Sequence, residues 1–340
     1  MKRLILPFLS LIALHSATYA NIDPKVSEIC LKAEDFQGCV ESFSGQKEKK
    51  LSNKSDFDNA MEFFKEGDSL EAIRSIDSFL GLNPDSKEGY ILSAFINTYD
   101  LSKFDEAMDD IDIAIDIDDK YAYPYALKAS VFYFELGGSF SKSLKYLQKG
   151  LELSPDDPYI NLIAGEIQFD NGFVVLGGDT NNLSKKSKDK KALSLQSFEK
   201  AKKSFEKTLT KINLDAYKNP LFESGYVQDV SYLTNALLGD TNFELYFLYK
   251  DKKERSTAKN YLEQAVEYYT KAIFMAPSQE EVIKIELDRD MDLYSPAELY
   301  FYRGNAYSWM NKDKQACSDW KVSKKLGNAD ARAMVKDWRC

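Results

Sequence analysis

Histidine is nearly absent from this 340-residue chain, and its scarcity excludes the commonest forms of nucleophilic catalysis. The single histidine, His15, lies in an N-terminal segment that we expect to be removed on export. A mature chain without histidine cannot form a Ser-His-Asp or Cys-His arrangement. The Walker loop, GxGxxG and GxSxG patterns are also missing. We therefore expect a protein that is not an enzyme and that holds no cofactor.

Metal-ligand patterns are equally scarce. The sequence contains no CxxC pair, which excludes the common zinc and redox spacings. Asp288, Asp290 and Asp292 match the opening of a calcium loop. Leu293 stands where the loop needs glycine, and Leu299 stands where it needs a bidentate glutamate. We interpret this stretch as a solvated acidic loop and predict no metal site.

An excess of positive charge is also lacking, since the formal net charge is −9. This balance disfavours a generic role in binding nucleic acid. Charge is nevertheless gathered in blocks: residues 104–119 hold eight acids and no base, and residues 183–211 hold ten lysines. Such blocks are usually exposed faces. The lysine-rich block leaves one alternative open, an adaptor that docks on an anionic membrane surface.

No hydrophobic run is long enough to span a bilayer, which takes about 18 residues. The longest N-terminal run covers only residues 4–14 and follows Lys2 and Arg3. Small residues at Thr18 and Ala20 then provide a cleavage site. These three parts predict a secretory signal peptide over residues 1–20. The mature protein would then lie in the periplasm of a bacterial cell envelope or in a comparable lumen.

Cysteine is rare but even in number, with Cys30, Cys39, Cys317 and Cys340. An even count in an oxidising compartment predicts two disulfides, for which three connectivities exist. We favour Cys30 with Cys39 and Cys317 with Cys340, because each pair lies within one local helical unit. Residues 21–52 would then form a disulfide-closed helical hairpin and a linker, and the two bonds would clamp the ends of the chain.

The sequence does show helical periodicity. Its composition also contains enough hydrophobic residues to bury a large core. Residues 297–327 predict two helices with small and aromatic side chains at intervals of four and three. The recurring positions are Tyr300, Gly304 and Tyr307 in the first helix and Ala316, Trp320 and Ser323 in the second. A glycine at such a crossing lets a second backbone approach, so we predict a helical hairpin.

Similar units occur upstream and end at Pro84, Asp119 and Pro155, at spacings of 35 and 36 residues. Each repeats the small residues of the crossing, namely Ala60 and Ala72, Ala94 and Ala107, and Ala129 and Ser143. This pattern resembles the tetratricopeptide repeat (TPR), a 34-residue helix-turn-helix.

The resemblance implies an all-α fold, a right-handed superhelical solenoid of five or six hairpins over residues 53–330. Insertions would lie at about 170–195 and 278–296, and residues 329–340 would form a capping helix at the open end. A further second helix is predicted around Ala265 and Tyr269. Its first helix, within 226–250, is either one long helix broken at Gly239-Asp240 or two short ones.

The resemblance also implies a function. TPR first helices line a groove that takes an extended or helical peptide, so we expect a scaffold or adaptor that binds a protein or peptide partner. Ala126 and Ser130 argue against a clamp for a peptide carboxylate. An envelope enzyme with its active site in the insertions is the other alternative. The inward-facing positions of the family correspond here to Phe57, Met61, Phe64, Ile91, Phe95, Tyr99, Tyr123, Ser130, Tyr133, Asn161, Gly165 and Gln168.

Overall fold

A computed structural model describes residues 55–177, 188–212, 230–251, 254–280, 282 and 294–340. These residues belong to one compact unit that runs from Ser55 to Cys340. The predicted signal peptide, the hairpin over residues 21–52 with its Cys30–Cys39 bond, and the acidic loop at residues 288–292 lie outside the described residues.

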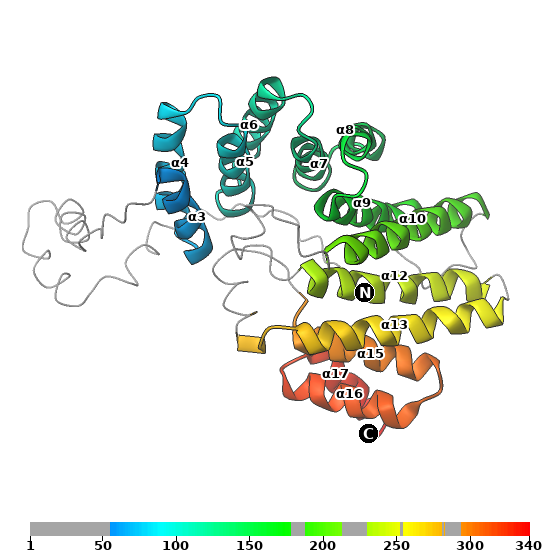
Figure 1. Cartoon of the computed structure of the whole chain (residues 1–340). Helices are drawn as coiled ribbons and strands as arrows, with labels where there is room; N and C mark the ends of the chain where they lie inside the picture. Colours follow the sequence, from blue (N-terminus) through cyan, green and yellow to red (C-terminus); the bar gives the residue numbers. More distant parts are fainter. Residues whose placement is uncertain (1–54, 178–187, 213–229, 252–253, 281, 283–293) are drawn as a thin grey trace, which may run out of the picture. The chain divides into compact units, whose positions relative to one another are not determined.

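All regular structure within the described ranges is helical, and consecutive helices pack in pairs (Figure 1). This confirms the predicted all-α array of hairpins. The six pairs are α3 (Asp56–Glu66) with α4 (Ser69–Leu82), α5 (Lys87–Phe95) with α6 (Phe104–Ile117), α7 (Tyr123–Ser130) with α8 (Phe140–Leu153), α9 (Pro158–Leu176) with α10 (Lys188–Ile212), α12 (Val230–Asp251) with α13 (Arg255–Met275), and α15 (Pro296–Trp309) with α16 (Asp313–Lys325). Helix α17 (Ala329–Asp337) packs on α16.

Two first helices continue into short π-helical turns, η1 (Ile96–Asp100) after α5 and η2 (Val131–Glu135) after α7. Helix α12 is one helix that passes straight through Gly239, so the break expected there from the sequence is absent. Helices also cover both ends of the stretch expected to hold the first insertion, since α9 ends at Leu176 and α10 begins at Lys188. None of the described helices is both long and apolar enough to span a membrane.

Local sequence signals explain where these helices begin and end. Ser55 caps α3 in a reciprocal pair with Asp58, and Ser295 caps α15 in the same way with Glu298. Each capping box satisfies backbone N–H groups that have no partner within the helix. Helix α3 ends at Gly67, whose φ of 78° lies in the left-handed region that favours glycine. Capping side chains therefore fix where α3 and α15 begin, and a glycine fixes where α3 ends.

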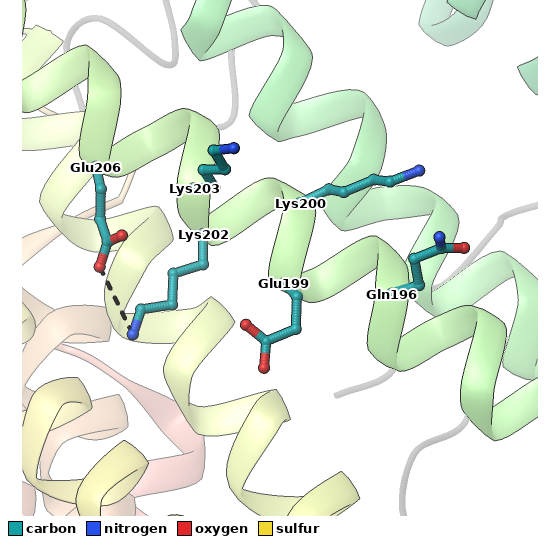
Figure 2. A pocket seen from close by; sticks show the side chains of 6 residues that line it. All are labelled: Gln196, Glu199, Lys200, Lys202, Lys203 and Glu206. Carbon is teal, nitrogen blue, oxygen red and sulfur yellow. Dashed lines mark ion pairs between the residues drawn. The ribbon is translucent and has the colours of Figure 1, made fainter.

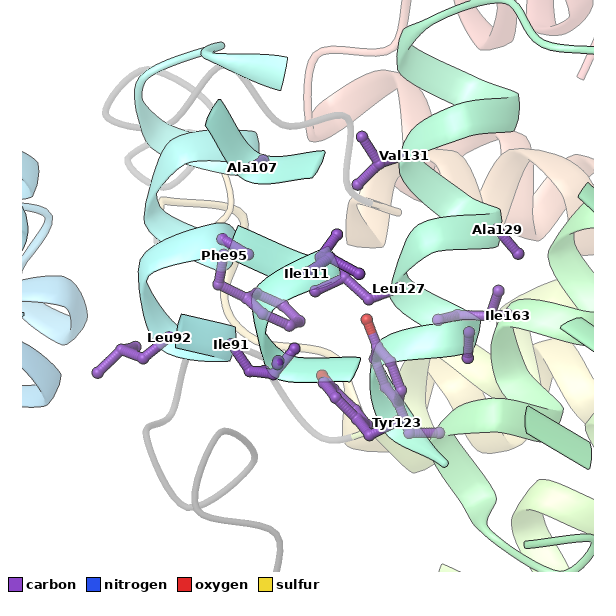
Figure 3. Close-up of a cluster of buried hydrophobic side chains, with 14 of the residues drawn as sticks. Ile91, Leu92, Phe95, Ala107, Ile111, Tyr123, Leu127, Ala129, Val131 and Ile163 are labelled. Atoms are coloured by element: carbon purple, nitrogen blue, oxygen red, sulfur yellow. The ribbon is translucent and has the colours of Figure 1, made fainter. Parts of the chain in front are cut away.

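Packing inside the array passes from one hairpin to the next without a single central core. Ile91 and Phe95 of α5, Tyr123 of α7 and Ile163 of α9 belong to one buried cluster that extends over several hairpins (Figure 3). A repeat that cannot bury its apolar face alone must bury it against its neighbours. The array is therefore stabilised by interfaces between adjacent hairpins.

Glycines on three first helices make room for aromatic rings of the second helices. We predicted from the sequence that Gly304 admits a second backbone, and the Ala316 carbonyl oxygen of α16 lies 3.3 Å from a Cβ added there, but the Trp320 indole lies closer still. A Cβ added at each glycine would overlap a buried ring. The pairs are Gly165 with Phe205 at 2.2 Å, Gly239 with Tyr269 at 2.4 Å, and Gly304 with Trp320 at 2.7 Å.

The end of the array carries the predicted disulfide between Cys317 and Cys340. It spans 23 residues and ties α16 to the chain that follows α17. Next to it, the rings of Trp320 and Trp338 lie 5.2 Å apart. Together the bond and the ring contact hold the capping helix on the last hairpin.

Removing this disulfide gives a first testable prediction. A loop of this length corresponds to about 3 kcal/mol in the chain-entropy model, and measured values are often smaller. We expect the double variant Cys317→Ser and Cys340→Ser to lose about 2 kcal/mol of unfolding free energy in urea titrations. Hydrogen exchange should speed up in α16 and α17 and stay unchanged in α5 and α6. Equal acceleration in all hairpins would contradict a local clamp.

Candidate functional site

A stack of aromatic rings crosses three successive first helices. The Tyr123 ring of α7 lies 4.6 Å from Tyr159 of α9 and 6.0 Å from Phe95 of α5, measured between ring centroids. Tyr121 extends the stack, with its ring 6.3 Å from that of Tyr123. Lys87 lies over the Tyr121 ring at 4.8 Å. The stack therefore joins α5, α7 and α9 on one continuous face.

The two π-helical turns occupy equivalent places in successive repeats. Residues Ile96 and Val131, at which η1 and η2 begin, are separated by one repeat length of 35 residues. A π-helical turn holds one more residue than an α-helical turn, and such turns often occur at functional sites. η2 presents Tyr133, Phe134 and Glu135 at the end of its first helix. These turns therefore widen the first helices at the ends of α5 and α7.

Two carboxylates lie on the same stripe of α9 as Tyr159. Seven and eleven residues further on, Glu166 and Asp170 share its side of the helix. The Tyr133 hydroxyl donates a hydrogen bond of 2.8 Å to Asp170, which connects η2 to α9. We call Tyr133, Tyr159, Glu166 and Asp170 the α9 site. It places the Tyr133 phenol beside the Asp170 carboxylate, with Tyr159 and Glu166 on the same stripe of α9.

Glu166 is the electrostatically exceptional member of the α9 site. It forms no hydrogen bond or ion pair within the described part of the chain, and burial raises its pKa to about 7. Burial also raises the pKa of Glu135 on η2. Burying a carboxylate without a counter-charge is unfavourable, and such groups are enriched at functional sites. The α9 site is therefore short of positive charge.

Most of the residues predicted for the groove are buried side chains. Phe57, Met61 and Tyr133 are partly exposed, and the side chain of Tyr99 lies outside the described residues. The other predicted side chains are less than a tenth exposed, namely Phe64, Ile91, Phe95, Tyr123, Ser130, Asn161 and Gln168. Their role in binding stays a prediction, and in this conformation they pack against neighbouring residues.

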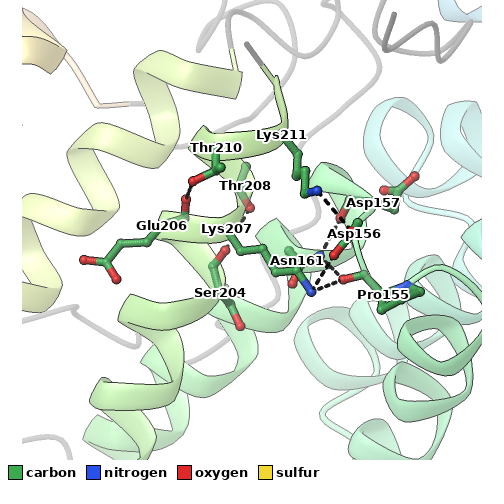
Figure 4. A network of polar contacts seen from close by, with 10 residues as sticks. All are labelled: Pro155, Asp156, Asp157, Asn161, Ser204, Glu206, Lys207, Thr208, Thr210 and Lys211. Carbon is green, nitrogen blue, oxygen red and sulfur yellow. Dashed lines mark hydrogen bonds and ion pairs between the residues drawn. The ribbon is translucent and has the colours of Figure 1, made fainter. Parts of the chain in front are cut away.

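In the fourth repeat the structure shows a different register from the one we predicted. The Asn161 amide donates to the carbonyl oxygens of Pro155 and Asp157 at 3.0 and 2.7 Å, so it caps its own turn (Figure 4). Gly165 faces the Phe205 ring. Sequence reasoning missed the neighbouring Glu166. It lies eleven residues after Pro155, the end of its repeat unit, just as Phe95 lies eleven residues after Pro84 and Ser130 eleven residues after Asp119. The spacing signal was present in the sequence.

An open hollow of about 420 Å³ lies along α10 (Figure 2). Its lining consists of Gln196, Glu199, Lys200, Lys202, Lys203 and Glu206. Glu199 accepts hydrogen bonds from Tyr249 and Tyr261 at 3.1 and 2.7 Å. Lys202 donates to Gln264 at 2.6 Å and lies 3.6 Å from Glu206. These contacts connect α10 with α12 and α13, so Glu199, Lys202 and Glu206 already have partners within the protein.

Two lysines of the basic block also have structural partners. Lys207 and Lys211 each lie 3.0 Å from the Asp156 carboxylate and hold its pKa below the usual value (Figure 4). Lys207 also donates to the Pro155 carbonyl, and Thr208 donates to the Pro158 carbonyl at 3.0 Å. This end of α10 is thereby attached to the start of α9. Where the structure describes the chain, it places no group of three or more metal-ligating side chains together.

Comparisons with known proteins identify the fold of the chain. No family model and no curated protein matches the sequence. Among solved structures, PilW, described as a widely conserved type IV pilus biogenesis factor, matches at 15% identity over 82% of this chain and 96% of its own, with a TM-score of 0.51. A chain of the APC/C hetero-tetramer Cut9-Hcn1 matches at 15% identity and a TM-score of 0.50, over 92% of this chain and about half, 51%, of that one. YrrB, described as a TPR protein with an unusual peptide-binding site, matches at 11% identity over 77% of this chain and 97% of its own, with a TM-score of 0.39.

The stacked hairpins, their repeat length and the matches to PilW and to the Cut9-Hcn1 chain together define the class. The described residues have the fold of a TPR solenoid, as the resemblance in the sequence implied.

Proposed function

We propose that this protein is an exported, non-catalytic scaffold that binds a segment of a partner protein along the first helices of its repeats. The observation that carries the proposal is Glu166, a carboxylate that lacks a counter-charge within the described structure and lies on the face of the aromatic stack. Solenoids of this kind use continuous faces as extended binding surfaces.

The chemistry of the α9 site specifies the partner segment. A lysine or arginine placed beside Glu166 would supply the missing charge, and a charge-assisted hydrogen bond in a partly buried site contributes roughly 1.5–3 kcal/mol. The partly exposed phenol ring of Tyr133 would cover the apolar part of the same side chain. The partner segment is therefore basic, with apolar residues beside its basic one.

Capture of the partner tests the proposal. Mature protein is crosslinked in the exported fraction, the captured proteins are identified by mass spectrometry, and the crosslinked segments are made as peptides. We expect Glu166→Gln to weaken binding of such a peptide about tenfold, in line with the loss of one charge-assisted bond. The matched control is Glu263→Gln, an exposed glutamate on α13 that should leave binding unchanged. Equal binding by both variants would remove the α9 site from the proposal.

The ionisation of Glu166 gives a prediction that needs no partner. Its pKa is about 7 in the folded protein and 4.5 when unperturbed, so the folded state binds the proton more tightly than the unfolded state. The stability associated with the protonated form is complete below pH 4.5 and is lost as the pH rises through 7. We expect Glu166→Gln to raise the unfolding free energy by roughly 1–2 kcal/mol at pH 8 and to leave it unchanged at pH 4, as measured in urea. Stabilisation of equal size at both pH values would show that charge is not the cause.

Export is a separate part of the proposal. It rests on Lys2, Arg3, the short apolar run and the small residues before Asn21. Mass spectrometry of protein from the exported fraction should find an N-terminus at Asn21. An intact Met1 in that fraction would contradict cleavage.

A further inference from the structure

A lysine is surrounded by three aromatic rings near the ends of two first helices. The Lys250 ammonium of α12 lies 3.8 Å from the ring centroid of Trp309, 5.5 Å from that of Tyr246 and 6.0 Å from that of Phe247. Trp309 is the last residue of α15, whereas the other two rings precede Lys250 by four and three residues on α12. Two successive first helices thus build one group, and we call Tyr246, Phe247 and Trp309 the aromatic cage.

The rings of the cage support one another. The Trp309 centroid lies 5.3 Å from that of Phe247, in an edge-on arrangement, and 5.8 Å from that of Tyr246. Phe243 packs edge-on against Phe247 at 5.1 Å and backs the cage from within α12. Tyr246 is 8% exposed and Trp309 is 44% exposed. The cage therefore has a fixed inner wall and one wall that solvent can reach.

The cation in the cage has no ion pair. Within the described ranges no carboxylate lies in salt-bridge distance of Lys250, and burial lowers the pKa of its ammonium. Lys271 shows the contrasting arrangement: its ammonium lies 5.1 Å from the single ring of Tyr268 and 2.7 Å from the Glu267 carboxylate. Within the described part of the chain the Lys250 ammonium, although the residue is exposed, lies against ring faces with no anion beside it.

We propose that Tyr246, Phe247 and Trp309 form a binding site for a quaternary ammonium group, which Lys250 occupies when that ligand is absent. Ring faces attract cations through their quadrupoles, and several rings around one point favour a bulky alkylated ammonium. A lysine ammonium is strongly hydrated, and each contact with a ring removes water from it. A quaternary ammonium keeps the charge without N–H groups to desolvate, so it fits the same rings at a lower desolvation penalty. Lys250 is an internal competitor for the site.

A titration with tetramethylammonium chloride tests the proposal, read by ligand NMR line broadening and by tryptophan fluorescence, with sodium chloride at equal ionic strength as the reference. If Lys250 fills the cage about nine-tenths of the time, its removal raises the apparent affinity about tenfold. We expect Lys250→Ala to bind the probe about tenfold more tightly than the unaltered chain. Lys271→Ala is the matched control and should not differ from the unaltered chain. Adding Trp309→Ala to Lys250→Ala should abolish binding.

Two results would overturn the proposal: no gain in affinity in Lys250→Ala, or equal binding after the loss of the Trp309 ring. Trp309→Phe guards against a folding defect, because it keeps a ring of weaker quadrupole and should weaken binding without changing the circular dichroism spectrum. Choline and a trimethyllysine peptide serve as further probes in the Lys250→Ala background. Tighter binding of choline identifies a small soluble ligand, and tighter binding of the peptide identifies a modified protein.

Discussion

Replacing Gly165 by alanine is expected to lower the unfolding free energy by about 3 kcal/mol, although alanine is intrinsically the better helix former. The reason lies across the helix pair, where the new methyl group would lie 2.2 Å from a ring carbon of Phe205. That ring is fully buried, so it can yield only if α9 and α10 move apart. Urea titration measures the loss.

Two further variants isolate this packing effect. Gly81 lies inside α4, and the structure places no described atom within 4 Å of a Cβ added there, so Gly81→Ala should stabilise the protein by up to about 1 kcal/mol. Phe205→Leu shortens the side chain that opposes Gly165. In a double-mutant cycle, Gly165→Ala with Phe205→Leu should be at least about 1 kcal/mol more stable than the sum of the single changes. Strict additivity would show that the ring and the glycine do not oppose each other.

Asp319→Ala is expected to cost roughly 4 kcal/mol, because it leaves a buried guanidinium without its anion. Arg303 donates to the two carboxylate oxygens of Asp319 at 2.7 and 2.8 Å. Its remaining amino group donates to Thr270 of α13 at 3.1 Å, so one side chain connects α13, α15 and α16. The side chains of the pair are only 15% and 8% exposed. Differential scanning calorimetry should show a lower melting temperature for the last hairpins.

The loss should reflect an unpaired charge and not the value of the bond itself. Replacing both partners, with Arg303→Met and Asp319→Leu, should recover most of the stability, because well-packed apolar pairs replace buried ion pairs at little cost. The exposed pair of Lys259 and Glu263 provides the comparison, and Glu263→Ala should change stability by no more than about 0.5 kcal/mol. A double variant as unstable as Asp319→Ala would contradict this account.

Spacing in the sequence predicted the hairpins because it records which side of each helix is buried. The intervals of four and three around Gly304 and Trp320 need no knowledge of the rest of the chain. The spacing did not reveal what the small residue faces, since a missing side chain is compatible with a neighbouring backbone or with a neighbouring ring. That choice depends on the residue opposite, and for Gly165 the residue opposite is 40 positions away in Phe205.

The candidate sites were harder to predict for the same reason. Glu166 has the right spacing, but its significance comes from the absence of a described counter-charge, which is a property of the fold. The aromatic cage joins residues about 60 positions apart, and no repeat rule connects Lys250 with Trp309. The terminal disulfide was predictable because Cys317 and Cys340 belong to one local unit.

The glycine and ring pairs affect which helices pair with each other during folding. Tandem units of similar shape can mispair during folding, with one unit taking a partner from its neighbour. Here the helix bearing Gly165 receives a phenyl ring, the one bearing Gly239 a phenol and the one bearing Gly304 an indole, whereas the earlier first helices carry Ala94 and Ala129 at the matching crossings. An indole forced against either alanine would meet a methyl group. The size of each ring thus fits the room left by the small residue on its own partner helix. This match distinguishes the units from one another and disfavours swapped arrangements before the chain has finished folding.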